Sequence, residues 1–549
     1  MKFLKKHYQL FFVVFIILLG GYLRFYNANW DNYQVFHPDE RNIDNAVTKI
    51  NFVSQLDPDF FAYGGLPIYL YKVSGEMMNT VYQTSVWTSD WGHINQIGRT
   101  FSAFFSTLTI LVIFLLGKKV FNKITGIIAS FIFTFTVSSI QIAHFATTES
   151  FIILIVTLLT YLSLCYYEKP RSFLLAALAV TSGLGIAAKT TALSFLMIPF
   201  LSLLLIDFKT KGKNIISFIF KPVFFFALTI TIFFLFSPYT FLSYHKFLQS
   251  MNYETGVATG RVIVPYTHQF DKTISYLYEL YNLFWQMGPV FALSLLGLGF
   301  VLYFTFKKRK ASYLFILIFP IIYFLYAASW HAKFIRYMTP LLPFFSLYAA
   351  FALSIFIKRY KILGRIILFI FLTTSAIWAL SYMSVYSKPQ TRYTASLWML
   401  ENIKSGELVL TEHWDDGLPI YIPGKNMFFK TEQLTIYDNE FNNKAEYLAN
   451  MLASADYISL TTRRLHGSLI YLTENYPVTS RYYRYLFAEK LGYTKVAEFS
   501  SYPSFLGIEI NDDASEESFQ VYDHPKIIIF KNTKHLSYEE LNRIISANN

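Results

Sequence analysis

The sequence has 549 residues, of which 54% are hydrophobic and only 15% are charged, and its net charge is +12. This composition leaves too little polar surface for a soluble globule of that size, so we predict a polytopic membrane protein. The positive charge does not indicate nucleic-acid binding, because the basic residues lie in short clusters between apolar runs, where they orient membrane helices. With Cys165 as its one cysteine, the chain has no intramolecular disulfide and no cysteine-based metal site.

Long apolar runs dominate the first two thirds of the chain. Each has roughly 20 residues, the length of a helix that crosses a bilayer, and we count about eleven of them. The first, residues 9–26, follows a basic start but no small-residue cleavage site, so we interpret it as a retained anchor. The later runs lie near residues 97–117, 124–142, 149–167, 172–188, 190–206, 222–241, 284–305, 312–329, 337–357 and 364–383.

Basic residues predict the orientation of these spans. They gather at every second connection, for example at 118–123 and 307–310, and connections of this kind face the cytoplasm. We therefore expect a cytoplasmic N-terminus, and an odd number of spans places the C-terminus outside the cell membrane. The connection at residues 27–96 is expected on the outer face.

The composition divides the chain into two predicted domains. Residues 1–383 form a transmembrane domain, which includes the outer loop 27–96 with surface helices near 42–53 and 67–81. Residues 384–549 alternate charged residues with short hydrophobic stretches, and we predict a soluble extracytoplasmic α/β domain. Its strands are expected at 407–412, 456–461, 493–499, 505–510 and 526–530, and its helices at 394–403, 444–455 and 537–547.

Two adjacent acids follow the first span, in the stretch Phe36-His37-Pro38-Asp39-Glu40-Arg41. Two carboxylates just outside a membrane helix are placed for chemistry at the membrane surface. The same pattern is also how an ordinary helix begins, with proline in the first turn and acids at the positive end of the helix dipole. The local sequence leaves both interpretations open.

Further charged or titratable residues mark the outer ends of later spans. Burying a charge near the bilayer is costly, and such residues tend to mark a function. Each also has a structural explanation, as a helix cap or as a side chain that extends to the lipid headgroups. Their convergence on one face favours an outer pocket whose wall admits a lipid, and the residues are Arg99, His144, Glu149, Lys189, His331, Lys333 and Arg336.

The order of these motifs resembles the dolichyl-phosphate-mannose protein mannosyltransferase superfamily, the GT-C class of membrane glycosyltransferases. The resemblance rests on Pro-Asp-Glu in the first loop, an acid after the third span, a lysine near the fifth, and Arg336-Tyr337-Met338-Thr339-Pro340-Leu341-Leu342-Pro343 at a late span. It covers residues 1–383, and the tail is similar to those of prokaryotic members. It implies a GT-C fold, a sugar donor carried on polyprenyl phosphate, an outer active site and an inverting transfer.

The resemblance also implies roles for single residues. Asp39 matches the catalytic acid of the family, Glu40 its neighbour, and Glu149 a second acid in the later turn. Arg336 matches the arginine that binds the donor phosphate, and Lys189 and Lys333 are further candidates for phosphate contacts.

Metal binding stays an open alternative at this point. His37, His144 and His331 are candidates for metal or acceptor contacts, and no other cofactor is expected. Aminoarabinose transferases of the superfamily carry Lys-Pro-Pro in the first loop, whereas this chain has Tyr63-Gly64-Gly65-Leu66-Pro67. The missing lysine argues against that sugar and against assuming the metal site of those enzymes.

The predicted activity is transfer of a sugar from a polyprenyl-phosphate donor, of the dolichyl-phosphate type, to a hydroxyl on a protein, lipid or glycan. A carboxylate can take the proton of that hydroxyl, and fixed cations stabilise the departing phosphate. The alternative is a transporter or flippase for a lipid-linked or polar solute, which predicts charges within the spans and repeated halves. The charges gather instead at the outer ends of the spans, and the sequence shows no repeat.

Overall fold

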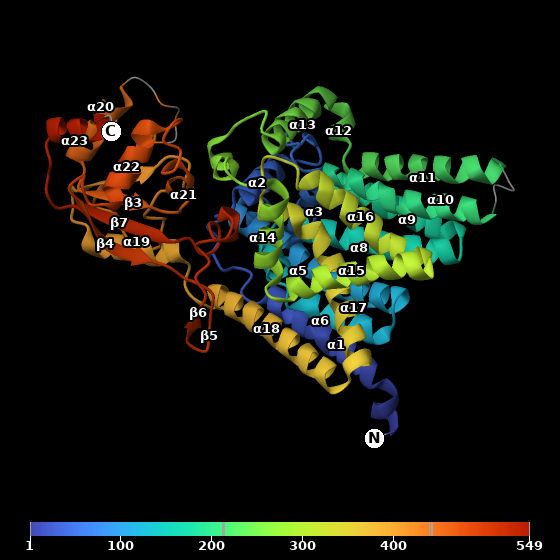
Figure 1. The fold of residues 1–549 in the computed structure, drawn as a ribbon. Helices are drawn as coiled ribbons and strands as arrows, with labels where there is room; N and C mark the ends of the chain where they lie inside the picture. The colour runs from blue at the N-terminus through green and yellow to red at the C-terminus, as the bar shows by residue number, and fades with distance from the viewer. Residues whose placement is uncertain (1, 211–214, 437, 439, 441–442, 548–549) are drawn as a thin grey trace. The chain divides into compact units, whose positions relative to one another are not determined.

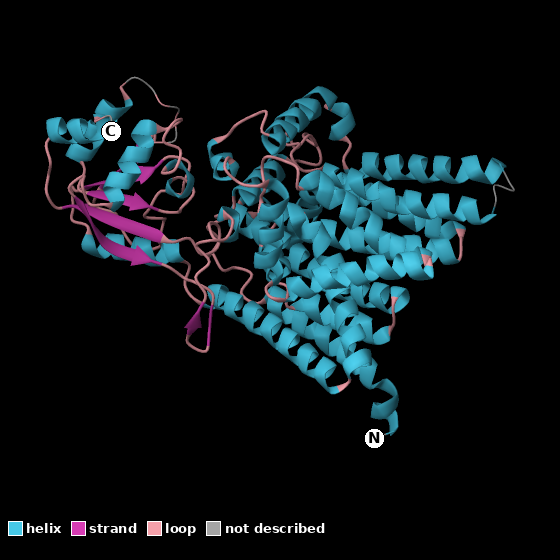
Figure 2. Cartoon of the chain, viewed as in Figure 1, coloured by secondary structure: helices cyan, strands magenta, loops and turns pink. Residues whose placement is uncertain are grey.

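The protein forms two compact units, which are described separately. The computed structural model describes residues 2–547 except 211–214, 437, 439 and 441–442 (Figure 1). The first unit comprises Met1–Thr259 and Ile274–Leu380, and the second comprises Gly260–Thr273 and Ser381–Asn549. The described strands all belong to the second unit (Figure 2).

Long apolar helices build the first unit. Among the described residues, seven helical runs are long and apolar enough to cross a membrane, and the pair α6 and α7 passes the same test as a span bent by 64°. Three shorter apolar helices complete the set, and each expected span corresponds to one of these helices. The predicted polytopic helical fold is therefore confirmed. The bounds are α1 Lys2–Phe25, α5 Trp91–Val120, α6 Lys123–Thr134, α7 Val137–Gln141, α8 Glu149–Glu168, α9 Ser172–Ala188, η2 Thr190–Leu196, α10 Met197–Thr210, α11 Ile215–Phe236, α15 Val290–Lys308, α16 Ala311–Ala327, η4 Ile335–Leu341, α17 Leu342–Tyr360 and α18 Ile362–Ser387.

The helices of this unit pack around α5 and α17. α5 contacts α1, α6 and α8, and α17 contacts α6 and α15. A Cβ atom at Gly297 of α15 would stand 1.9 Å from the carbonyl oxygen of Tyr348 in α17, so α15 and α17 approach this closely only because the residue is glycine. The buried aliphatic and aromatic side chains between these helices form one continuous core.

Arg24 stabilises the break between α6 and α7. Its guanidinium is fully buried and donates to the carbonyl oxygens of Phe133 (3.2 Å) and Thr134 (3.3 Å), where α6 ends. The last carbonyls of a helix have no partner within the helix, and an apolar environment makes such orphans costly. The span can therefore bend after α6, because Arg24 provides hydrogen bonds for these two carbonyls.

Short helices occupy the long connections of the first unit. Helices are present where the two surface helices are expected, and both begin a few residues earlier than their apolar spacing predicts. α2 packs against α3, and both contact α5. The bounds are α2 Pro38–Lys49, α3 Gly65–Tyr82, α4 Val86–Ser89, α12 Tyr239–Leu242, α13 Tyr244–Thr259 and α14 Ser275–Met287, together with the short turn η1 Ile142–His144.

The second unit contains a mixed five-stranded sheet in the order β2-β1-β3-β7-β4. β1 is parallel to β2 and β3, whereas β7 is antiparallel to β3 and β4. The expected single strand at 505–510 is a small hairpin, because Leu506 and Gly507 take left-handed φ angles of 51° and 81° and reverse the chain. The bounds are α19 Thr391–Asn402, β1 Leu408–Glu412, β2 Lys430–Leu434, α20 Lys444–Ser454, β3 Tyr457–Leu460, α21 His466–Leu469, α22 Pro477–Phe487, β4 Tyr493–Phe499, β5 Ser504–Phe505, β6 Ile508–Glu509, β7 Ile527–Asn532 and α23 Tyr538–Ser546, with the turns η3 Pro265–Phe270 and η5 Glu517–Phe519.

A buried charge network lies in the same unit. His524 is enclosed between Asp523, 2.6 Å from its Nδ1, and Asp512, 2.7 Å from its Nε2. Burial lowers the pKa of a histidine, but the two carboxylates outweigh this and raise the pKa of His524 to about 10. Tyr382 and Tyr386 donate to Asp523 at 2.9 and 2.8 Å, so the network ties the end of α18 to the C-terminal segment.

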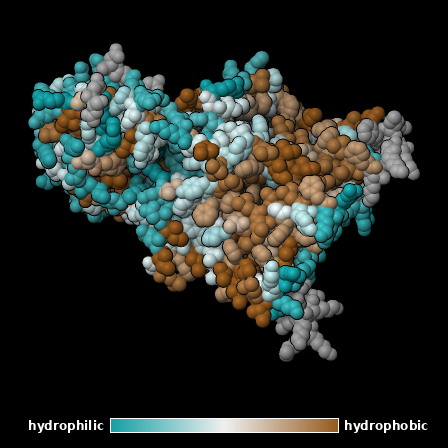
Figure 3. Space-filling model, viewed as in Figure 1, coloured by the Kyte–Doolittle hydropathy of each residue, from teal (hydrophilic) through white to brown (hydrophobic). Residues whose placement is uncertain are grey.

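Hydrophobic side chains cover the outside of the helical unit. Figure 3 shows a mainly hydrophobic surface over this unit and a mainly hydrophilic surface over the second. On α11, Phe220, Ile230 and Leu235 are among the exposed large apolar residues. A surface of this kind is stable in lipid and not in water, so the chain is a multi-span membrane protein.

Candidate functional site

α2 begins immediately after His37, and the start of the helix and the candidate site use the same residues. His37 is the N-cap residue, and its Nδ1 accepts a hydrogen bond from the backbone N–H of Asp39 at 3.1 Å. Pro38 presets the backbone of the first turn. The structural interpretation of this stretch is thus correct, and it leaves the side chains of Asp39 and Glu40 available to contact cations.

Asp39 pairs with Arg336, which follows it by 297 residues. The guanidinium of Arg336 donates to Oδ2 of Asp39, and the hydroxyl of Tyr63 donates to the same oxygen at 2.9 Å. The side chains of the ion pair are 25% and 22% exposed, so a ligand can reach them. The expected catalytic acid and the expected phosphate-binding arginine therefore lie in direct contact.

The ion pair controls the protonation of Asp39. Burial alone would raise the pKa of this carboxyl, but Arg336 and His37 outweigh burial and lower the pKa to about 2. Asp39 is consequently ionised at neutral pH. While Arg336 holds it, however, a carboxylate with so low a pKa is a poor proton acceptor.

A second ion pair joins Glu149 at the start of α8 to Lys189 at the end of α9. Nζ of Lys189 donates to Oε1 of Glu149 at 2.7 Å and lies 5.0 Å from the centre of the Tyr63 ring. Since the Tyr63 hydroxyl binds Asp39, this ring connects the two ion pairs. A Cβ atom at Gly64 would stand 2.0 Å from the carbonyl oxygen of Ala187, so glycine at this position lets the first loop reach the end of α9.

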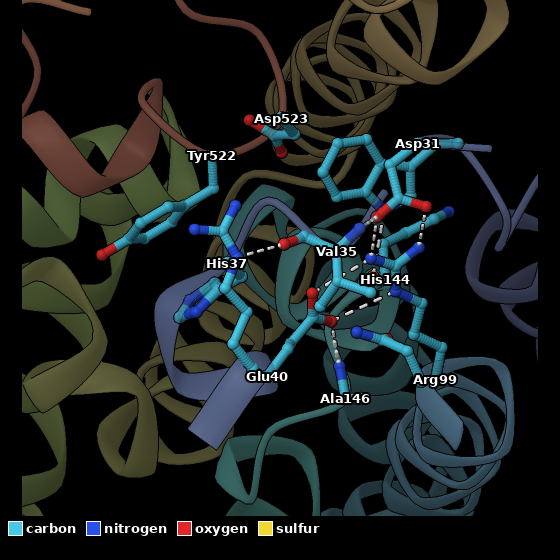
Figure 4. Close-up of polar contacts among 12 residues, drawn as sticks. Asp31, Val35, His37, Glu40, Arg99, His144, Ala146, Tyr522 and Asp523 are labelled. Carbon is cyan, nitrogen blue, oxygen red and sulfur yellow. Dashed lines mark hydrogen bonds and ion pairs between the residues drawn. The ribbon is translucent and has the colours of Figure 1, made fainter. Parts of the chain in front are cut away.

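Glu40 extends into a buried network with Arg99 and Ala146 (Figure 4). Arg99 donates to its two carboxylate oxygens at 3.1 and 3.0 Å and to Asp31 at 2.9 and 2.6 Å, and the backbone N–H of Ala146 donates to it at 2.5 Å. Glu40 is fully buried. These contacts fasten α2 and the turn before α8 to α5.

His144 and Lys333 have backbone partners. Both ring nitrogens of His144 lie 2.9 Å from backbone carbonyl oxygens, those of Ile140 and Tyr26, so neither has a lone pair directed at a metal. Lys333 is buried, and its Nζ donates to the carbonyl of His331 at 2.8 Å. Within the described part of the chain, no group of three or more His, Cys, Asp or Glu side chains is arranged to hold a metal ion.

The loop that carries Arg336 is held by α14. The side-chain amide of Asn282 donates to the carbonyl of Lys333 at 2.9 Å, and that of Gln286 donates to the carbonyl of Ile335 at 3.0 Å. Both amides are completely buried. Both hydrogen bonds hold the backbone just before Arg336, the residue that contacts Asp39, so α14 fixes the segment from which Arg336 extends.

Sequence reasoning missed several residues of this site. Tyr63 was noted only because its segment lacks the Lys-Pro-Pro of the aminoarabinose transferases. Asp31, Asn282 and Gln286 belong to no motif that the sequence analysis recognised. The amphipathic spacing of α14, with polar residues on the same face at positions 279, 282 and 286, is the signal that could have identified two of them. Glu254 of α13 was also missed, although its carboxylate interacts electrostatically with Asp39, Arg336 and Lys189.

Comparison with known proteins agrees with this architecture. Residues 91–241 match a family model described as dolichyl-phosphate-mannose-protein mannosyltransferase, and this segment includes Arg99, Glu149 and Lys189. No curated protein matches the sequence.

Among solved structures, the Archaeoglobus fulgidus oligosaccharyltransferase in its apo form is 15% identical with a TM-score of 0.53, over 93% of this chain and 76% of that one. The same enzyme in complex with Zn and sulfate gives 15% identity and a TM-score of 0.54, over 91% and 72% of the two chains. ArnT from Cupriavidus metallidurans bound to undecaprenyl phosphate is 14% identical with a TM-score of 0.46, over 71% and 72%. The expected GT-C fold is confirmed. The match of residues 91–241 also confirms the resemblance to the dolichyl-phosphate-mannose-protein mannosyltransferase family.

Proposed function

We propose that this protein is a membrane glycosyltransferase that moves a sugar from a polyprenyl-phosphate donor to an acceptor hydroxyl at the outer face of the membrane, with inversion at the sugar C1. The observation that carries the proposal is the contact between Asp39 and Arg336. It brings together an acid that can remove a proton and a cation that can bind a phosphate. The name of the family matched by residues 91–241 supports a polyprenyl-phosphate donor.

In the proposed reaction, the acceptor oxygen forms a bond to C1 of the sugar. The bond between C1 and the phosphate oxygen breaks, and the polyprenyl phosphate leaves with the electron pair. The acceptor proton passes to a carboxylate, for which we propose Asp39. Phosphate is a good leaving group when cations neutralise it, so Arg336 and Lys189 can act without a proton donor.

Arg336 links donor binding to the chemistry. A phosphate offers the guanidinium two oxygens in the geometry that it binds best. When Arg336 turns to the donor, Asp39 loses the partner that lowers its pKa most, and its carboxylate becomes a stronger base. In this proposal, the base is therefore strengthened only when the donor is in place.

The test is the variant Asp39→Asn, which keeps the size of the side chain and the hydrogen bond from Tyr63 but cannot accept a proton. We expect a folded protein whose sugar transfer is lower by roughly 100-fold or more, the usual effect of losing a general base. Transfer is measured with radiolabelled undecaprenyl-phosphate mannose and a serine- and threonine-containing peptide, and folding is followed by the midpoint of thermal unfolding.

Two variants complete this experiment. Glu149→Gln tests the second acid, and Glu40→Gln separates a positioning role from a chemical one, because loss of its contact with Arg99 should lower stability together with activity. Parental transfer by all three folded variants would contradict the proposal that one of these carboxylates is the base. A folded parent that transfers no sugar would contradict the glycosyltransferase proposal and favour the transporter alternative.

A further inference from the structure

α13 lies across the site and is attached on both sides of it. At one point, the hydroxyl of Thr190, next to Lys189, donates to Sδ of Met251 at 3.4 Å. Near the end of α13, the carbonyl of Ala258 accepts a hydrogen bond of 3.0 Å from the backbone N–H of Ala332, in the loop that leads to Arg336. The helix therefore connects the segments that supply the two cations of the site.

Glu254 lies between these attachment points on the same face of α13. Positions 251, 254 and 258 follow the spacing i, i+3, i+7, which places their side chains along one stripe of a helix. The electrostatic interactions of Glu254 agree with this placement, because they involve Asp39, Arg336 and Lys189. The stripe that faces the site thus presents a carboxylate to it.

Glu254 differs from the other acids of the site because it is exposed and its carboxylate has no hydrogen-bond or ion-pair partner among the described residues. Asp39 is held by Arg336 and Tyr63, Glu149 by Lys189, and Glu40 is fully buried. Glu254 is exposed, and it has no hydrogen bond or ion pair with any side chain or backbone group in the described part of the chain. A molecule arriving from solvent can bind this carboxylate without displacing a protein partner.

We propose that Glu254 binds the acceptor. A carboxylate accepts hydrogen bonds from hydroxyl or ammonium groups and repels anions, so Glu254 would select a neutral or cationic hydroxyl compound and disfavour an acidic one. This inference rests on the proposed transferase function and specifies the acceptor side of its site.

The same charge has a predictable effect on the donor. Glu254 lies near the cations that would bind phosphate, and its negative charge opposes binding of a second anion. Loss of hydration of the carboxyl and repulsion from Asp39 raise the pKa of Glu254, although Arg336 and Lys189 act in the opposite direction. Removing this charge should leave phosphate binding unchanged or make it stronger, whereas removing the charge of Arg336 should weaken it.

The experiment compares the full-length parent with Glu254→Gln in detergent. Binding of a neutral serine- and threonine-containing peptide to protein loaded with undecaprenyl phosphate should weaken about 10-fold or more, the scale of a lost hydrogen bond to a charged group. The Kd of undecaprenyl phosphate should stay the same or fall. With undecaprenyl-phosphate mannose as donor, kcat/KM for the peptide should fall in parallel, and the preference for the neutral peptide over one with flanking aspartates should shrink.

Glu474→Gln is the matched control, because Glu474 is an exposed glutamate of the second unit, and it should behave like the parent. An unchanged Kd for the peptide in Glu254→Gln would overturn the inference. Weakened undecaprenyl-phosphate binding together with a lower unfolding midpoint would also overturn it, because it would mean that Glu254 supports the fold. Failure of the transferase proposal itself is seen separately, as a folded parent that binds undecaprenyl phosphate but transfers no sugar from undecaprenyl-phosphate mannose.

Discussion

The ion pair between Asp39 and Arg336 gives each side chain a property that it would lack alone. Asp39 stays ionised in a mostly buried position because Arg336 offsets the effect of burial. Arg336 in turn is held at the site by Asp39 before any donor arrives. The resting site is therefore ready to bind the donor while its base is held weak.

Arg336→Lys keeps the positive charge but loses the two parallel hydrogen bonds that a guanidinium can donate to a phosphate. We expect the Kd of undecaprenyl phosphate to rise about 10-fold and turnover to fall with it. Binding is measured with the radiolabelled lipid, and turnover with undecaprenyl-phosphate mannose.

Arg365→Lys, at an exposed arginine of α18, serves as the control for the substitution itself, and Lys333→Ala should weaken binding less than Arg336→Lys does. Unchanged kinetics in Arg336→Lys would mean that this arginine only anchors its span.

At the scale of elements, α14 acts on the site without facing the substrate. Its amides hold the backbone at Lys333 and Ile335, and a displacement of about 1 Å in a catalytic group can cost roughly 100-fold in rate. The helix thus helps to fix the position of the loop that carries Arg336.

Gln286→Met keeps the volume of the side chain but removes the N–H donor to Ile335. We expect the affinity for undecaprenyl phosphate to fall several-fold while the protein remains folded, with the unfolding midpoint lowered by the loss of one buried hydrogen bond. Gln249→Met, at an exposed glutamine of α13, should leave both quantities unchanged. A lower midpoint with parental affinity would restrict Gln286 to a role in stability.

The elements themselves were largely predictable, because their signals are local. Length and hydropathy located the membrane helices, and alternation located β1, β3, β4 and β7 within one or two residues. β2 was missed because its residues, Lys430–Leu434, are polar and mostly exposed at an edge of the sheet. α22 was missed as well, since its tyrosines have only modest helix propensity and the helix is fixed by burial of Tyr482 and Leu486.

The sequence predicted individual candidate residues of the site but not which of them contact one another. The cost of burying charge identified Asp39, Glu149, Lys189 and Arg336 individually. Nothing in the sequence distinguishes Glu40 from its neighbour, because adjacent helix positions point about 100° apart and only the packed structure shows which of them meets Arg99. Glu254 lies on a polar helix where a glutamate is unremarkable by composition.

The orientation of the whole molecule is a separate prediction. Basic clusters at alternate connections place 307–310 in the cytoplasm and residues 384–549 outside. Single cysteines at Lys308 and Lys425, in a chain whose Cys165 is replaced, should react oppositely with a membrane-impermeant thiol reagent on intact cells: the second should be labelled and the first protected. Both should be labelled after the membrane is permeabilised. Equal labelling in intact cells would reject the predicted topology.

The segment Gly260–Thr273 belongs to the second unit although it precedes most of that unit in the chain. His268 lies 3.1 Å from the hydroxyl of Tyr476, and Gln269 donates to Glu517 at 3.2 Å; these partners are made 208 and 248 residues later. At ribosomal rates of about 5 to 20 residues per second, the segment waits on the order of 10 to 50 s for them. The segment therefore remains without these partners until the rest of the second unit has been synthesised, and a gene fragment encoding only residues 381–549 would produce that unit without one of its own pieces.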